Sequence, residues 1–238
     1  MTTSAYHERA ANGLADAALE CIWTHSGSTA AAGHLVIPDN CADILLELAP
    51  DGSVADASVV GVMTRPVHVA ARPVHLVGLR FRPGWLAPLL RVDAAVVRDA
   101  RVPLSSVAPS WARALESDHP LARLLDEVGT SVAAHRGPTP VVRAVLDEVR
   151  TNPTELRVES VCRAQGVSRQ FLARVFNQQV GIGPKFVARV SRLARVRGAM
   201  SSRRGDWARL AAESGFADQS HLVREMRALA GAVPTALL

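Results

Sequence analysis

A pattern that occurs twice in the last hundred residues restricts the fold of this chain more than any other feature. The small residue Cys162 is followed four positions later by Gly166 and then by an apolar residue, and the same arrangement returns 49 positions later, beginning at Ala211. An internal repeat of this kind indicates a duplicated structural unit. Five more residues recur at an offset of 50: Leu172 and Leu222, Arg174 and Arg224, Phe176 and Met226, Gly181 and Gly231, and Pro184 and Pro234.

Each copy has the spacing of two helices joined by a tight turn. The small residue suits a close helix crossing, and the glycine allows the positive φ of the turn. Ser168 and Asp218 are placed to cap the second helix of each copy. Each copy is therefore predicted to be a helix-turn-helix unit. The expected helices span residues 158–164 and 168–179 in the first copy, and 207–213 and 218–229 in the second.

The outward face of the second helix in the first copy is rich in hydrogen-bond donors and free of acids. Leu172, Val175 and Phe176 are expected to face the core in the first copy, and Leu222 and Met226 in the second. Such an outward face suits a helix that enters the major groove of DNA. The outward residues are Arg169, Gln170, Ala173, Arg174 and Asn177 in the first copy, and Gln219, His221, Val223 and Arg224 in the second.

A helix is also predicted between the two copies, from Pro184 at its first position to about Met200. Its length of roughly 24 Å, with packing at each end, could hold two reading helices roughly 34 Å apart, one turn of DNA. One chain would then contact two successive major-groove segments. Basic residues along and beside this helix are expected to touch phosphates: Lys185, Arg189, Arg192, Arg195, Arg203 and Arg204.

The distribution of charge agrees with this prediction. From Thr139 onward the chain has 16 basic and 8 acidic residues, a net charge of +8, whereas residues 1–138 have 11 and 14, a net charge of −3. Nearly all the basic residues are arginines, whose planar fork donates two parallel hydrogen bonds to a phosphate or to guanine. A GC-rich genome would also favour arginine codons.

The first eighty residues show a different pattern. Short β-branched or alternating segments lie between turn formers such as Pro38-Asp39-Asn40, which predicts six or seven strands in a small β-barrel, cupin-like domain. From Gly84 the period becomes helical. The fold class is therefore α+β, with a β-rich sensing or dimerisation domain and its helical extension over 1–136, a linker over 137–140, and an all-α domain over 141–238.

Residues 141–238 resemble the AraC family of bacterial transcription regulators. The strongest stretch runs from Gly215 to Met226 and on to Gly231-Ala232-Val233-Pro234, similar to the signature GF-x-(D/S)-x-S-x-F-x-R-x-F…G-x-(S/T)-P. The resemblance implies seven helices, double-stranded DNA as partner, and RNA polymerase as a further partner of an activator. It places the base-facing positions at Gln170, Ala173 and Arg174 in the first unit and at Gln219, Ser220, Val223 and Arg224 in the second.

The chain departs from this family pattern at several positions. Met226 replaces the usual Phe, which Met can do because it fills irregular apolar space. Gly183 and Val233 replace the Ser or Thr before each Pro, and Val supplies no capping oxygen, at a cost of about 1 kcal/mol. Ala173 stands where a longer polar side chain is common, so the first unit would discriminate bases mainly through Gln170 and Arg174.

The amino-terminal residues resemble the barrel-like sensor domains that accompany such tails, and the resemblance does not imply a ligand. Arg65-Pro-Val-His68 recurs seven residues later as Arg72-Pro-Val-His75, so a hairpin centred on 71–72 would oppose the two histidines. The alternative to a functional histidine pair is that both are ordinary strand histidines, either exposed or hydrogen-bonded. Arg65, Arg80 and Arg82 could line a pocket for a carboxylate or phosphate, unless they pair with Asp39 or Asp43 instead. The candidate ligand-binding residues are Arg65, His68, His75, Arg80 and Cys41.

Cys41 lies between two acids, which would raise the pKa of its thiol and favour a buried, unreactive cysteine. The three cysteines form no CxxC pair, and the first residues are unlike a signal peptide, so we expect reduced thiols and a cytoplasmic protein without a membrane span. No cofactor or metal is expected.

The sequence leaves two alternatives to a ligand-modulated DNA-binding regulator. An enzyme on the amino-terminal barrel would need catalytic residues, and the chain has no Ser/His/Asp order, GxGxxG, HExxH or paired-carboxylate signature. The other alternative is a DNA-binding regulator without an effector, whose amino-terminal domain only forms a homodimer.

Overall fold

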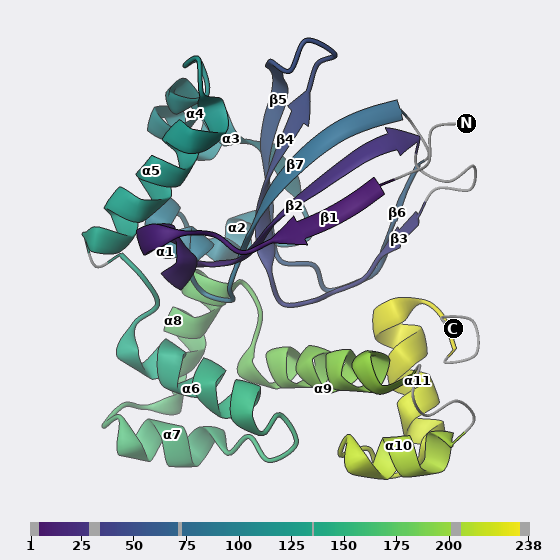
Figure 1. Ribbon diagram of the computed structural model, residues 1–238. Helices are drawn as coiled ribbons and strands as arrows, with labels where there is room; N and C mark the ends of the chain where they lie inside the picture. Colours follow the sequence, from purple (N-terminus) through teal and green to yellow (C-terminus); the bar gives the residue numbers. More distant parts are fainter. Residues whose placement is uncertain (1–4, 29–33, 71–72, 135, 201–205, 234–238) are drawn as a thin grey trace.

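A computed structural model describes residues 5–28, 34–70, 73–134, 136–200 and 206–233. Two lobes lie one above the other (Figure 1). We call the elements from β1 to α5 the amino-terminal lobe and the helices α6 to α11 the carboxyl-terminal lobe. The α+β class predicted from the sequence is confirmed, because a sheet with following helices precedes an all-helical part.

The amino-terminal lobe is built on an antiparallel sheet with the strand order β1-β2-β7-β4-β5-β8. Strands β1 and β8 are its edges, so these six strands form an open sheet rather than a hydrogen-bonded closed barrel. A separate ladder joins β3 and β6. The strands are β1 (Ala5–Arg9), β2 (Leu19–Ser28), β3 (His34–Val36), β4 (Ala42–Leu48), β5 (Val54–Val60), β6 (Val67–Val69), β7 (Pro73–Phe81) and β8 (Arg101–Pro103).

One face of the large sheet is covered by helices. Ile44 and Leu46 of β4 and Leu79 and Phe81 of β7 lie at alternating positions of their strands, and all four are fully buried against the helical layer. Each side chain of this size stabilises the fold by about 1.5 to 3 kcal/mol when it is removed from water. The covering helices are η1 (Gly13–Ala17), α1 (Leu86–Leu90), α2 (Ala94–Val97), α3 (Leu104–Val107), α4 (Pro109–Ala114) and α5 (Pro120–Ala133).

The expected hairpin centred on residues 71–72 is not formed. β6 pairs with β3, which places His68 opposite Leu35, whereas β7 lies between β2 and β4, which places His75 opposite Ser26 and Leu48. The prediction that the two histidines face each other was therefore wrong. Residues 71 and 72 themselves lie outside the described part of the chain.

The carboxyl-terminal lobe confirms the helices predicted from the repeat. Its supporting and reading helices coincide with the expected ranges to within one residue, and a long helix joins the two units. The seventh helix that the resemblance implies would begin at Pro234, which lies outside the described residues. The helices are α6 (Pro140–Thr151), α7 (Val158–Ala164), α8 (Arg169–Val180), α9 (Pro184–Met200), α10 (Trp207–Glu213) and α11 (Gln219–Ala230).

The turns of both units have the local chemistry that the sequence predicts. Ser168 Oγ accepts a hydrogen bond from the backbone N–H of Phe171 at 3.1 Å, and Asp218 Oδ1 accepts one from His221 N–H at 2.6 Å. Gly166 and Gly215 adopt φ values of 64° and 74°, in the left-handed region that glycine enters at little cost. These caps and turns fix where α8 and α11 begin.

Each unit has its own hydrophobic core, and α9 contributes to both. Val187 and Ala188, near its start, pack in the first core with Leu172 and Phe176. Leu193 and other residues further along α9 pack in the second core, with partners from α10 and α11. The two units are therefore joined through the packing of this helix in both cores.

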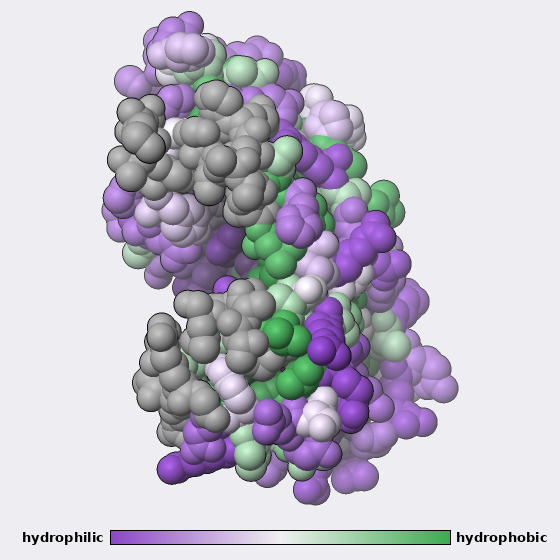
Figure 2. Space-filling model, turned by 90° about the vertical axis from the view of Figure 1, so that its right-hand side faces the viewer, coloured by the Kyte–Doolittle hydropathy of each residue, from purple (hydrophilic) through white to green (hydrophobic). Residues whose placement is uncertain are grey.

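The amino-terminal lobe also contacts both units. Val62, just after β5, lies in the core of the first unit, and Ile37 packs against the core of the second. Asn40 is buried, and its side-chain Nδ2 donates to the backbone oxygen of Val187 and to Ser191 Oγ of α9, each at 3.1 Å. On the face shown in Figure 2, hydrophobic residues continue across the junction of the lobes.

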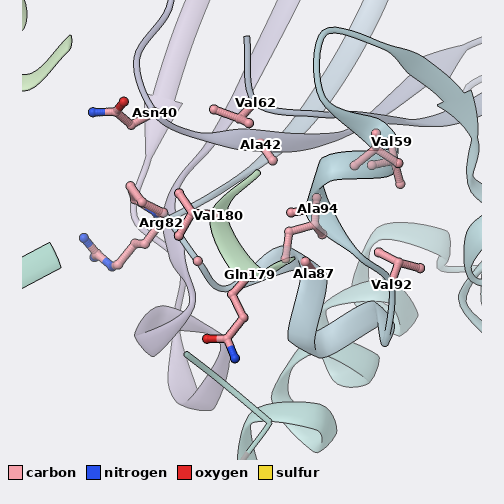
Figure 3. A pocket seen from close by; sticks show the side chains of 14 residues that line it. Asn40, Ala42, Val59, Val62, Arg82, Ala87, Val92, Ala94, Gln179 and Val180 are labelled. Atoms are coloured by element: carbon pink, nitrogen blue, oxygen red, sulfur yellow. The ribbon is translucent and has the colours of Figure 1, made fainter. Parts of the chain in front are cut away.

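A small pocket of about 20 Å³ lies at this junction, between the sheet, α1, α2 and the end of α8. Figure 3 shows Val59, Ala94 and Val180 on its apolar walls, while the polar ends of Arg82 and Gln179 point away from it. Its volume is that of about one water molecule. Among the described residues, no helix is long and apolar enough to cross a membrane.

Candidate nucleic-acid interface

The first reading helix, α8, turns its polar side outward. Leu172, Val175 and Phe176 are buried, as expected. The expected reading residues Arg169, Gln170, Ala173 and Arg174 are all exposed. Arg169 donates to Glu159 Oε1 of α7 at 2.9 Å, so one acid of the supporting helix reaches this face.

The second reading helix, α11, is arranged similarly. Gln219, Ser220 and Arg224 are exposed, whereas Val223 is half-buried. His221 is half-buried too: its Nδ1 accepts the backbone N–H of Ala217 at 3.3 Å, and its ring meets Phe216 edge-on, with 5.4 Å between ring centres. The structure therefore places the side chain of His221, in the first turn of α11, against the turn of the unit rather than on a freely exposed surface.

Both reading helices present the same end to the amino-terminal lobe. Gly181 caps the carboxyl end of α8 and Gly231 that of α11. A Cβ on Gly181 would lie 2.9 Å from Val62 Cγ1, and a Cβ on Gly231 would lie 3.3 Å from Pro66 Cγ. Both helices consequently end at this lobe, while their amino-terminal turns lie away from these contacts and are exposed.

A cleft of about 600 Å³ lies beside the first reading helix. The amino-terminal ends of α7, α8 and α9 all border it, and these ends carry partial positive charge. Arg157, Arg169 and Lys185 add three basic side chains, against the single acid Glu159. Such a surface suits a phosphate backbone. Arg157 was not predicted from the sequence, because it stands between two helices and outside the repeat.

Three of the arginines expected to contact phosphate bind other parts of this lobe. Arg189 Nε and Nη2 donate to the two carboxylate oxygens of Glu225 at 2.8 and 3.0 Å. Arg192 Nη1 donates to the backbone oxygen of Gly215 at 3.1 Å, and its guanidinium lies 5.2 Å from the centre of the Phe216 ring. These contacts tie α9 to the second unit.

Arg195 contacts α6, which precedes α9 in the chain. Its Nη2 donates to the backbone oxygens of Arg150 and Thr151 at the end of α6, at 3.2 and 2.8 Å. A cation is favourable at these unsatisfied carbonyls. Lys185 is exposed, whereas Arg203 and Arg204 lie outside the described residues.

The candidate ligand-binding residues of the amino-terminal lobe are dispersed. Arg65, His68 and His75 are exposed and belong to different segments, and the registers of β6 and β7 do not bring the two histidines together. Arg80 lies among three acids, with ion pairs of 3.4 Å to Asp43, 3.5 Å to Asp39 and 3.7 Å to Glu8. This is the pairing that the sequence offered as the alternative to an anion site.

The surroundings of Arg80 affect two titrating groups. Burial raises the pKa of Asp43 to about 6, against the opposing effects of Arg80 and of the Trp23 Nε1 hydrogen bond at 2.9 Å. Burial, with Asp39 and Asp43, raises the pKa of the Cys41 thiol well above its ordinary value. Cys41 is therefore a protonated, weakly nucleophilic thiol. Within the described ranges, no three His, Cys, Asp or Glu side chains are grouped to hold a metal ion.

Residues 161–238 match a family described as a helix-turn-helix domain, and residues 10–103 match a domain of unknown function, DUF6597. No curated protein matches the sequence.

Among solved structures, ToxT from Vibrio cholerae O395 is similar, with a TM-score of 0.45 and 11% identity over 90% of this chain and 96% of that one. An apo ToxT variant from Vibrio cholerae strain SCE256 is similar with a TM-score of 0.47 and 9% identity, over 96% of this chain and 98% of that one. The carboxyl-terminal domain of AraT, a response regulator from Geobacillus stearothermophilus, is similar with a TM-score of 0.39 and 20% identity, over 42% of this chain and 84% of that one.

The paired units, their caps and the family match together define a DNA-binding transcription regulator. The carboxyl-terminal lobe carries the match to a helix-turn-helix domain, in the residues whose motifs resemble those of the AraC family, and the amino-terminal lobe carries the match to DUF6597.

Proposed function

We propose that this protein is a cytoplasmic, sequence-specific transcription regulator whose helices α8 and α11 read adjacent major-groove segments of one DNA molecule. The observation that carries the proposal is the common orientation of the two helices. Both end at the amino-terminal lobe, and both expose donor-rich amino-terminal turns. Gln170 and Arg174 are the base readers of the first unit, and Gln219 and Arg224 those of the second.

The phosphate contacts in this proposal centre on the cleft beside α8. Lys185 and Arg157 flank the converging helix ends, and Arg169 can leave its exposed pair with Glu159 at little cost, because such pairs contribute about 0 to 1 kcal/mol. Arg189, Arg192 and Arg195 have intramolecular partners, which favours a role in positioning the second unit.

We further propose that the amino-terminal domain modulates DNA binding. Support comes from Val62, Ile37 and Asn40, through which this lobe contacts both units and the helix between them. A small effector that shifted these contacts would change how the reading helices are held. Because Arg65, His68 and His75 are dispersed, these three residues do not form one effector site. A thermal-shift screen of the full chain against small metabolites would separate modulation by a small effector from the alternative of a domain without one.

The experiment that tests DNA reading is selection from a pool of random duplex DNA, followed by salt titration of the selected site. We expect one enriched sequence and a slope of log affinity against log salt of roughly −5 to −7, from six to eight neutralised phosphates. A pool that enriches no sequence, or a slope near zero, would contradict the proposal.

A further inference from the structure

The position equivalent to His221 in the first unit is Phe171, and the two residues differ in their surroundings. His221 packs against Phe216 and accepts a backbone hydrogen bond. In the first unit Val167 replaces Phe216, so the ring of Phe171 has no corresponding aromatic partner. Phe171 is 41% exposed, and within the described part of the carboxyl-terminal lobe no other large hydrophobic side chain is exposed to this degree.

The contacts of Phe171 involve the reading surface of α8. It is the third residue of the helix, and its backbone N–H is held by the cap at Ser168. The guanidinium of Arg174, one turn further on, lies 5.5 Å from the centre of its ring. A cation held over an aromatic face in this way loses part of its freedom, which keeps the guanidinium beside the ring.

The major groove offers one apolar group to such a ring, the 5-methyl group of thymine, and it offers guanine N7 and O6 to an arginine. We propose that Phe171 is a specificity-determining residue that contacts a thymine methyl, next to a guanine that Arg174 reads. The first unit then selects a site in which a thymine lies beside a guanine. This inference rests on the proposed function, because it requires α8 to enter the groove.

The test uses the full chain and the DNA that the selection provides. Each thymine is replaced in turn by deoxyuridine, which removes the methyl group and leaves every hydrogen-bonding group in place. For the wild-type protein, we expect one replacement within the segment bound by the first unit to weaken binding about threefold to tenfold, as loss of one buried methyl group implies. For Phe171→Ala, the same replacement should leave the affinity for the DNA unchanged.

Two further variants serve as controls. Phe171→Leu keeps an apolar contact and should retain part of the sensitivity to the methyl group. His221→Ala alters the equivalent position of the second unit and should leave the sensitivity in the first segment unchanged. Because Phe171 is exposed, its variants should unfold at the same urea concentration as the wild type.

The outcomes separate this inference from the proposed function. Specific binding without any deoxyuridine effect, or with an effect that persists in Phe171→Ala, overturns the methyl contact and leaves DNA reading intact. Unchanged DNA affinity combined with an altered oligomeric state in Phe171→Ala also overturns it, because the ring would then contact a second copy. A pool without an enriched sequence overturns the proposed function as well.

Discussion

Arginine side chains in the carboxyl-terminal lobe divide into two groups that the sequence does not distinguish. Arg174 and Arg224 are exposed at equivalent positions of the repeat. Arg189, Arg192 and Arg195 point to carboxylate or carbonyl oxygens of neighbouring elements. Their spacing along α9 predicted a basic helix, but their partners come from α6, the turn before α11, and α11 itself. Only the folded structure brings these together.

The two exposed arginines, Arg174 and Arg224, lead to a prediction about base reading. Arg174→Ala and Arg224→Ala should each weaken binding to the selected DNA by about 1 to 3 kcal/mol, because each removes a two-pronged contact to a base. Fluorescence anisotropy on selected and scrambled duplexes would measure this. Arg227→Ala is the control: it removes the same charge from the last turn of α11, nearer the amino-terminal lobe, and it should change both affinities little and equally. Unchanged specific affinity in both reading variants would contradict the base-reading roles.

Asp43 leads to a prediction about pH. Its pKa rises from an ordinary 3.8 to about 6 on folding, so its protonated form favours the folded state. The contribution is complete at low pH and is lost as the pH rises through about 6. In Asp43→Asn, which keeps an acceptor for Trp23, the free energy of unfolding should therefore fall less between about pH 4 and pH 7 than in the wild type.

Urea unfolding at a series of pH values would measure this difference. Asp51→Asn is the control, because hydrogen bonds from Ser53 lower the pKa of this exposed carboxyl group and give it the opposite pH dependence. Parallel pH profiles for wild type and Asp43→Asn would show that the carboxyl group is not shifted.

Among the elements, the helices of the repeat were predictable and the strand pairing was not. Gly166, Gly215, Ser168 and Asp218 mark helix ends by local chemistry, so the sequence alone located α7, α8, α10 and α11. The partner of a short strand depends on distant residues. Nothing local to His68 indicates that β6 pairs with β3 instead of β7.

The contacts between lobes were equally invisible in the sequence. Val62 belongs to the core of the first unit, although more than a hundred residues separate it from α8. The predicted linker is also packed: a Cβ on Gly137 would lie 2.9 Å from the Trp85 ring, and Gln179 Oε1 accepts the backbone N–H of Thr139 at 2.9 Å. The domain limits at 136 and 141 remain a prediction.

Gly181 allows a matched test of the contact between α8 and the amino-terminal lobe. Gly181→Ala adds a Cβ that would lie 2.9 Å from Val62 and 3.0 Å from the backbone oxygen of Ala94, at a φ of 86°. Gly166→Ala meets nothing within 4 Å at a φ of 64°. The control should lose about 1 to 2 kcal/mol of stability from the unfavourable φ alone, and Gly181→Ala should lose more. Equal losses in urea unfolding would contradict the close approach of the lobes.

The ion pair between α9 and α11 gives a test that distinguishes positioning from phosphate binding. Arg189→Ala should destabilise the protein by about 1 to 2 kcal/mol, because it leaves the mostly buried carboxylate of Glu225 unpaired. It should leave the salt slope of DNA binding nearly unchanged, whereas loss of a phosphate contact would lower the slope by about 0.9. Lys185 has an exposed side chain, so Lys185→Ala should leave the stability nearly unchanged and lower the salt slope. A lowered slope in Arg189→Ala would restore its phosphate role.

At the scale of the whole molecule, two structures set the distance between the reading helices. The first is α9, about 25 Å long for its 17 residues. The second is the amino-terminal lobe, whose short segment from Val62 to Pro66 approaches Gly181 at one end and Gly231 at the other. A change in that lobe is thereby connected to both helices at once. This arrangement is the physical basis on which we propose modulation of DNA binding.

A hydroxyl-radical footprint of the full chain on its selected DNA, repeated with five base pairs inserted at the centre of the site, tests the central claim most directly. The account predicts two protected segments about one helical turn apart on the same face, and loss of most of the affinity on insertion, because half a turn carries one segment to the opposite face. A single protected segment, or affinity that survives the insertion, would contradict it.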